Sequence, residues 1–173
     1  MKNVSIVLLF ALLFCGTSLS AQSYITGLGL RLGNIPTHRT LGLTLQQRIF
    51  KQVTLEGIVQ TDFQYNSTAH LLIEKHNRII SKRFNYYVGC GFSVGNEQST
   101  EEDHETQTII TTFGNKTMGV DLIAGIEATL LGFTASLDFK PNINLVGRNK
   151  FFQSQVGISL RYVLIRKKSF LKR

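Results

Sequence analysis

Residues 117–140 read TMGVDLIAGIEATLLGFTASLDFK, and this stretch decides the fold. Within residues 118–130 every second residue is apolar, and the residues between them are mostly small or polar. After the pair Leu131-Gly132, the same alternation resumes over residues 133–139. A period of two is typical of β-strands, and a two-residue connection is typical of a β-hairpin. Two antiparallel strands joined by a tight turn are therefore predicted here.

The same period of two continues through most of the chain after residue 23, with its weakest stretch at residues 69–74. The predicted strands cover residues 24–32, 40–46, 53–65, 69–74, 84–95, 117–130, 133–140 and 155–164. Only 17% of the 173 residues are charged, against about 25% in an average soluble domain. The two cysteines exclude a disulfide framework, and no Cys/His spacing forms a closed zinc site.

The N-terminus has the three parts of a secretory signal peptide. Lys2 supplies the positive charge, residues 4–14 the apolar stretch, and residues 18–21 the small side chains of a cleavage region. The apolar stretch has about half of the ~20 residues that a spanning helix needs. We therefore predict a cleaved signal peptide over residues 1–21, with cleavage after Ser20 or Ala21, and one barrel domain over residues 22–165.

The connections between the predicted strands alternate in length. From a periplasmic N-terminus, the inner turns fall at residues 47–52, 75–82 and 131–132, and the outer ones at 34–39, 66–67, 96–116 and 147–150. Short inner turns with at least one long outer loop are typical of outer-membrane barrels. The predicted fold is all-β: an eight-stranded antiparallel up-and-down transmembrane β-barrel located in the outer membrane.

The composition of the two faces favours a membrane barrel over a soluble lipocalin-like barrel, in which the faces are reversed. The less apolar face carries charges of both signs separated by glycines, which suits a narrow interior. The interior residues expected to neutralise one another, in a structural role, are Arg31, Glu56, Glu74, Asp121, Glu127, Asp138, Lys140 and Arg161. Asp62 is expected on the same face. The apolar face has aromatic residues near its strand ends, as interfacial girdles do, at Tyr24, Phe63, Tyr65, Phe84, Tyr86, Phe133, Phe139, Phe152 and Tyr162.

Three segments also resemble stretches of many Gram-negative barrels: Glu56-Gly57, Tyr87-Val88-Gly89-Cys90-Gly91 and Ser136-Leu137-Asp138-Phe139-Lys140-Pro141. Over residues 23–164 the chain resembles the small eight-stranded outer-membrane barrels of the OmpX or OmpA transmembrane-domain type. This resemblance implies outer-membrane lipid, lipopolysaccharide and the barrel-assembly machinery as partners. Such families end their last strand on an aromatic residue, whereas here a basic periplasmic tail, residues 166–173, follows the strand.

The net charge of +8 is unevenly distributed along the chain. Six of these charges come from Lys2 and residues 166–173. Further basic residues fall at predicted inner turns: Arg48, Lys51, Lys75, Arg78, Lys82 and Arg83. An exported chain rarely meets nucleic acid, so no nucleic-acid partner is expected. A periplasmic partner, anionic headgroups and simple solubility all remain open as explanations of these basic residues.

The long outer loop is acidic and is the predicted surface of the protein. Several of its residues are of types that can bind divalent cations, but they lack the spacing of an EF-hand. They are Glu97, Glu101, Glu102, Asp103, His104 and Glu105. The predicted function is non-enzymatic, without catalytic residues, metal or cofactor: envelope integrity, surface contact or adhesion through this loop. The alternatives are an accessory barrel of an envelope export complex, a soluble lipocalin-like binder of apolar ligands and, last, a lipid-modifying enzyme using His70 beside Ser67 or Thr68.

Overall fold

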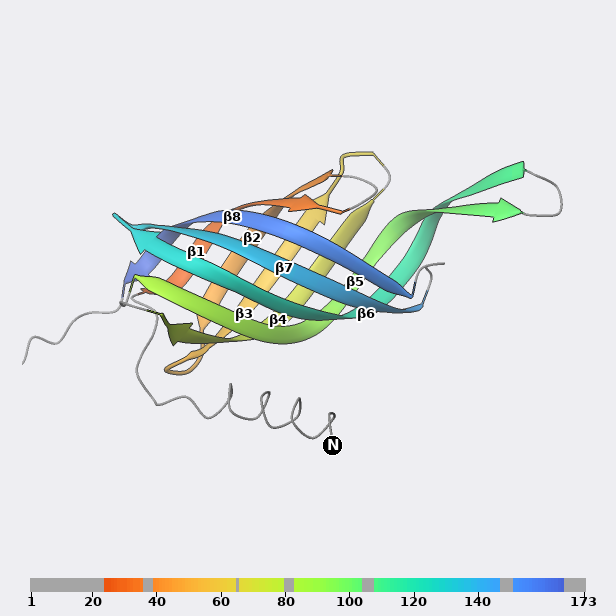
Figure 1. Cartoon of the computed structure of the whole chain (residues 1–173). Coiled ribbons are helices and arrows are strands. Elements are labelled where there is room, and N and C mark those ends of the chain that lie inside the picture. The colour runs from red at the N-terminus through yellow and green to blue at the C-terminus, as the bar shows by residue number, and fades with distance from the viewer. Residues whose placement is uncertain are drawn as a thin grey trace, which may run out of the picture.

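The alternating segments form the strands of one closed barrel in the computed structural model (Figure 1). The structure describes residues 24–35, 39–64, 66–79, 83–103, 108–146 and 151–166, so the predicted signal peptide and most of the basic tail lie outside it. The strands are β1 (Tyr24–Asn34), β2 (Arg39–Arg48), β3 (Val53–Thr61), β4 (Ser67–Arg78), β5 (Phe84–Asp103), β6 (Thr108–Leu130), β7 (Phe133–Val146) and β8 (Phe152–Arg166).

Each strand pairs antiparallel with the next, and β8 pairs antiparallel with β1 to close the barrel. The predicted eight-stranded up-and-down barrel is confirmed. The β6–β7 connection is the predicted two-residue turn, with φ 50° at Leu131 and 94° at Gly132. Positive φ at both central residues gives a type I′ turn, whose twist matches that of a hairpin. No described residue belongs to a helix of the length and apolarity that crossing a membrane requires.

Most observed strands are longer than predicted, as β7 is in continuing from residue 140 to Val146, and β3 is shorter. β3 ends at Thr61 because the Asp62 carboxylate accepts hydrogen bonds from the backbone N–H of Gln64 (2.8 Å) and of Asn66 (2.9 Å). Phe63, directly after Asp62, has a positive φ of 60°, so the chain turns where the sequence predicts an extended strand. Asp62 is therefore a turn residue outside the barrel interior, and Tyr65 lies outside the described residues.

β4 is one of the strands that are longer than predicted. It continues to Arg78 and remains paired with β5 as far as Arg78↔Asn85. Apolar residues do not alternate after residue 74, so the sequence predicts a turn over residues 75–82. The observed turn is shorter and begins after the strand ends at Arg78. Lys75 and Asn77 continue the odd-numbered positions of Leu71 and Ile73 but are polar, and this produced the apparent end of the strand, whereas His76 faces the interior like Glu74.

The long predicted loop is mostly a paired extension of β5 and β6. β4 pairs with β5 only as far as Asn96, and β7 pairs with β6 only as far as Met118, yet β5 and β6 remain paired out to Asp103↔Thr108. Figure 1 shows this ribbon projecting from the end of the barrel opposite the start of β1. We call residues 97–103 and 108–115 the outer arm. Glu97, Glu101, Glu102 and Asp103 belong to its β5 half, and His104 and Glu105 lie outside the described residues.

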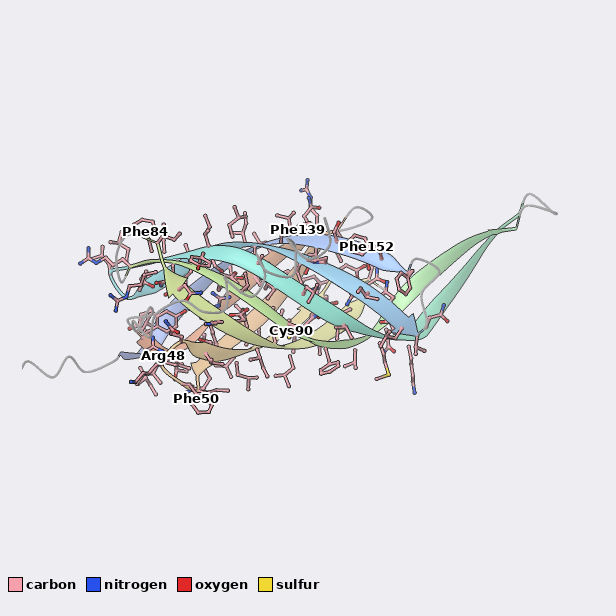
Figure 2. The ribbon with its side chains drawn as sticks, turned by 60° about the horizontal axis from the view of Figure 1, so that its bottom comes forward. Arg48, Phe50, Phe84, Cys90, Phe139 and Phe152 are labelled. Atoms are coloured by element: carbon pink, nitrogen blue, oxygen red, sulfur yellow. The ribbon has the colours of Figure 1, made fainter. Side chains whose placement is uncertain are left out.

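The outside of the barrel is apolar on every strand. Figure 2 shows side chains standing out around the barrel, with the free Cys90 among them on β5. Large apolar side chains about half exposed occur all round, including Leu30, Leu43, Val59, Ile73, Phe92, Leu122, Leu137 and Ile158. A monomeric soluble protein rarely exposes more than a few hundred Å² of continuous apolar surface. A barrel that is apolar outside and polar inside matches a membrane-spanning barrel and is the reverse of a lipocalin.

Tyr24 was predicted on this outer face and lies in the interior, 1% exposed. The cause is a bulge in the β1–β8 pairing between Tyr24 and Gly27, which shifts the register and leaves both Thr26 and Gly27 facing inward. The other described aromatic residues of the predicted girdles are at least partly exposed. Phe133 and Tyr162 form an edge-to-face pair at the inner end, with ring centroids 5.4 Å apart.

Candidate functional site

The polar interior of the barrel brings together the predicted charged residues. All eight are at most 3% exposed: Arg31, Glu56, Glu74, Asp121, Glu127, Asp138, Lys140 and Arg161. They come from six of the eight strands, because each strand alternates between the outer face and the interior. The described interior therefore holds five carboxylates and three cationic side chains, arranged in three groups along the barrel.

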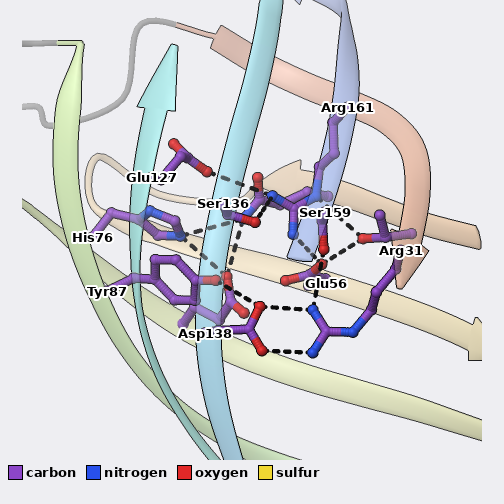
Figure 3. A network of polar contacts seen from close by, with 12 residues as sticks. Arg31, Glu56, His76, Tyr87, Glu127, Ser136, Asp138, Ser159 and Arg161 are labelled. Atoms are coloured by element: carbon purple, nitrogen blue, oxygen red, sulfur yellow. Dashed lines mark hydrogen bonds and ion pairs between the residues drawn. The ribbon is translucent and has the colours of Figure 1, made fainter. Parts of the chain in front are cut away.

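The first group surrounds Arg161 on β8 (Figure 3). Its guanidinium forms an ion pair with Glu56 on β3, and its Nη1 lies 3.7 Å from a carboxylate oxygen of Glu127 on β6. The same guanidinium donates to the hydroxyls of Thr44 (3.2 Å) and Ser136 (3.1 Å). One arginine thus links β2, β3, β6 and β7 across the interior.

Three further residues belong to this group, and the pattern of charged residues did not predict them. They are Tyr24, Gln46 and His76. The Tyr24 hydroxyl donates to Glu127 (2.7 Å) and also contacts the Gln46 side chain. The Gln46 amide donates to Glu74 (3.0 Å), whose carboxylate lies 3.1 Å from His76 Nε2. His76 has the same strand parity as Glu74, a signal that could have found it; the bulge that turns Tyr24 inward has no such signal.

The second group centres on Arg31 and Asp138. Two guanidinium nitrogens donate to the two carboxylate oxygens at 2.7 and 2.5 Å, and Arg31 also donates to the Ser159 hydroxyl (3.1 Å). The Tyr87 hydroxyl donates to the same carboxylate at 3.2 Å. A bidentate arginine–carboxylate pair of this kind fixes both side chains in one geometry.

Gly157 makes room for this pair. A methyl group added at Gly157 would overlap the Arg31 guanidinium, which Asp138 and Ser159 hold in place. We expect Gly157→Ala to lower the free energy of unfolding by about 1–3 kcal/mol, the usual cost of overpacking. Urea titration of the barrel in phospholipid vesicles measures it. Gly57→Ala is the matched control, since nothing lies within 4 Å of a methyl group there. Equal effects at the two glycines would contradict the proposed packing.

The third group lies toward the outer end. His70 Nδ1 contacts the Asp121 carboxylate at 2.7 Å, and the Asn142 amide donates to the other oxygen of that carboxylate at 2.6 Å. His70 Nε2 lies 3.1 Å from the Thr68 hydroxyl and 3.2 Å from the Gln60 amide. Lys140 belongs to this group, and its ammonium has no hydrogen-bond partner among the described residues.

Of the two hydroxyl residues expected beside His70, only Thr68 lies next to its ring. Thr68 and His70 face the interior together, whereas Ser67 is exposed at the start of β4. The order Asp121, His70, Thr68 is that of a nucleophile triad. However, the Gln60 amide also contacts His70 Nε2, and the Thr68 residue is only 8% exposed. The contacts support a packing role for His70 better than nucleophile activation.

Between these groups the interior is closed by large side chains. Ile58, Leu72, Tyr87 and Ile123 form a buried apolar cluster inside the barrel, and each is at most 2% exposed. The His76 ring stacks on Tyr87 with centroids 5.0 Å apart. An eight-stranded barrel has an interior just wide enough for side chains to fill. The residues above fill it with paired charges and an apolar layer.

The comparisons with known proteins rest on structure. No family model matches the chain, and no curated protein sequence matches it. The N-terminal β-barrel domain of Pseudomonas aeruginosa OprF is similar, with a TM-score of 0.57 and 12% identity over 82% of this chain and 98% of that one. The fold is that of a small outer-membrane β-barrel. Neisserial surface protein A (NspA) is similar as well, with a TM-score of 0.52 and 8% identity over 80% of this chain and 94% of that one.

These likenesses confirm the resemblance to small outer-membrane barrels at the level of the fold. Together with the apolar outer surface, they support the predicted outer-membrane location. They say nothing about partners, and the role of the interior charges rests on the geometry of this chain alone.

Proposed function

We propose that this chain is a non-enzymatic outer-membrane barrel that presents its outer arm for contact at the cell surface. The observation that carries the proposal is the continued pairing of β5 with β6 past the last partners of β4 and β7. This pairing gives the arm a defined shape rising from the barrel. The acidic residues of its β5 half favour a cationic or cation-bridged contact.

The interior supports a scaffold role for the barrel itself. A pathway for protons or solutes needs mobile water or exchangeable groups along the whole interior. Here Arg31 and Arg161 are fixed by carboxylates, and the cluster around Ile58 and Leu72 lies between polar groups. Paired buried charges and packed side chains make a rigid support for the arm, which is what a surface-contact protein requires.

Removing the arm tests the proposal. Asn96 and Lys116 are directly paired, so an Asn-Gly turn in place of residues 97–115 closes the hairpin in register. We expect the shortened chain to fold, shown by an unheated gel mobility like that of the intact barrel, and to lose attachment of cells to a test surface. The double variant Glu101→Gln with Glu102→Gln keeps the arm but removes two of its negative charges, so its attachment shows whether the charge of the arm is needed in addition to its shape. Unchanged attachment without the arm would contradict the proposal.

A second candidate, an accessory subunit of an envelope complex, is favoured by the inner end. Phe50 is 68% exposed and Leu131 88% exposed in the inner turns, and Arg48, Lys51 and Arg83 lie in or next to these turns. Lys75 and Arg78 are at the end of β4, and Lys82 lies outside the described residues. A photo-crosslinking residue at Leu131 that captures one defined envelope protein in intact cells would support this candidate; adducts with lipid alone would contradict it.

A further inference from the structure

Basic residues gather at the inner ends of β3, β4 and β5. They lie at the end of β2 and in the turn after it, at the end of β4 and directly before β5: Arg48, Lys51, Lys75, Arg78 and Arg83. Residues 47–53 and 75–84 contain no aspartate or glutamate, and the β6–β7 turn carries no charge. A local excess of positive charge attracts anions. This part of the inner end is therefore a candidate surface for an anionic partner.

Lys75 differs from the other basic residues because it belongs to the lipid-facing wall of the barrel. It continues the outward row of Leu71 and Ile73 on β4, which are 54% and 55% exposed. Across the sheet it pairs with Val53 on β3 and Val88 on β5. A lysine in such a position keeps its four-carbon stem on apolar surface and its ammonium at the membrane interface. The row on β4 thus passes from side chains that contact lipid chains to a cation at headgroup level.

The turn after β2 packs against this end of β4. The backbone N–H of His76 donates to the carbonyl of Gln52 at 2.8 Å. Lys51, directly before Gln52, is exposed, and Phe50 is 68% exposed. Figure 2 shows Phe50 at this end of the barrel. Because aromatic side chains favour the membrane interface, the turn brings a second cation and an interfacial ring next to Lys75.

This combination identifies the chemistry of the partner. The partner has to place an anion at Lys51 and Lys75 and an apolar chain along Ile73 at the same time. An acidic segment of a water-soluble protein supplies the anion but does not reach into the hydrocarbon beside Ile73. A phospholipid supplies both, and its phosphate oxygens accept charge-assisted hydrogen bonds from lysine.

We propose that an anionic phospholipid of the periplasmic leaflet binds at the inner ends of β3 and β4. Its phosphate lies at Lys51 and Lys75, and its acyl chains lie against Leu71 and Ile73. This site is separate from the outer arm and goes beyond the proposed function.

The chain contains no tryptophan, so a single introduced indole reports on its own surroundings. Ile73→Trp places the indole two residues from Lys75 on the same face. The folded barrel is inserted into vesicles of phosphatidylcholine mixed with phosphatidylglycerol, in which the phosphatidylglycerol carries brominated acyl chains. Bromine quenches indole fluorescence on contact, so the quenching at each lipid ratio gives the local preference for phosphatidylglycerol.

Leu137→Trp is the matched control for position. Leu137 is 47% exposed on the outer face of β7, and the inner turn next to β7 carries no charge. Near a membrane surface each lysine strengthens attraction to anionic lipid about fivefold. We therefore expect a preference of about fivefold for each contacting lysine at position 73 and no preference at position 137.

Charge variants in the Ile73→Trp chain test the two lysines. We expect Lys75→Gln and Lys51→Gln each to lower the preference for phosphatidylglycerol about fivefold. Lys116→Gln removes an exposed cation at the base of the outer arm and should leave the preference unchanged. The gel mobility of unheated samples checks that each variant is folded. Lys51→Gln, which changes an exposed turn residue, provides the test if Lys75→Gln does not fold.

Two results would overturn the proposal. The first is an equal preference at positions 73 and 137, which leaves an acidic segment of a periplasmic protein as the partner of these cations. The second is a preference at position 73 that neither Lys75→Gln nor Lys51→Gln lowers. Neither result bears on whether the outer arm mediates attachment, so the proposed function stands or falls separately.

Discussion

Arg161→Met is expected to lower the free energy of unfolding by about 3–5 kcal/mol, the usual cost of removing one partner of a buried ion pair. Arg161 is fully buried, and the Glu56 and Glu127 carboxylates share its guanidinium. Methionine fills much of the same volume but leaves both carboxylates without their cation. Reversible urea unfolding in phospholipid vesicles, followed by gel mobility of unheated samples, measures the loss.

Two further variants make this result specific. Arg39→Met removes an exposed arginine at the outer end and is expected to change stability little. Arg161→Met combined with Glu56→Gln removes both partners, and we expect it to recover a large part of the loss, since no unpaired charge then remains at Glu56. An equal loss in the double variant would mean that packing of the arginine chain, and not its charge, stabilises the interior.

Leu122→Arg is expected to lower the free energy of unfolding by roughly 2–4 kcal/mol, the range for a charge facing the bilayer midplane. Leu122 is 47% exposed on the outer face of β6 and is paired with Cys90 in the middle part of β5. Arginine at this position places a guanidinium among lipid chains. The same vesicle titration measures the effect.

Leu131→Arg is the control for that result, because Leu131 lies in the inner turn and is 88% exposed. An arginine at this position contacts water or lipid headgroups, so we expect the free energy of unfolding to fall by only about 0–1 kcal/mol. Comparable losses at Leu122 and Leu131 would contradict the placement of the β6 outer face in the hydrocarbon.

Much of the barrel is encoded locally and could be predicted from the sequence. The period of two around Leu122 and Leu137 fixes both the strands and their outward faces, and the Leu131-Gly132 turn fixes one register. The same parity places Glu56, Asp138 and Arg161 in the interior, because the interior positions of a narrow barrel are the only buried ones. What parity does not give is pairing: nothing in the sequence says that Arg31 faces Asp138, 107 residues away, while Arg161 faces Glu56.

The errors have local physical causes. A bulge turns Tyr24 inward, and a bulge inserts one residue without any compositional signal. The Asp62 side chain ends β3 by binding backbone N–H groups, which competes with strand extension. The outer arm was predicted as a loop because its polar composition lacks an apolar face. Within the described residues, β5 and β6 pair there only with each other, so no barrel wall requires their residues to alternate.

The central claim is that the apolar face of this barrel contacts lipid. The most direct test places a nitroxide on Cys90, which is free and exposed on the outer face of β5, in a chain that carries Cys15→Ser. The labelled barrel is inserted into phospholipid vesicles, and collisions of the nitroxide with oxygen and with a water-soluble nickel complex are compared by electron paramagnetic resonance. We expect frequent collisions with oxygen and few with nickel, as for a label in hydrocarbon. Frequent collisions with nickel and few with oxygen would show that this face contacts water and would contradict a membrane-spanning barrel.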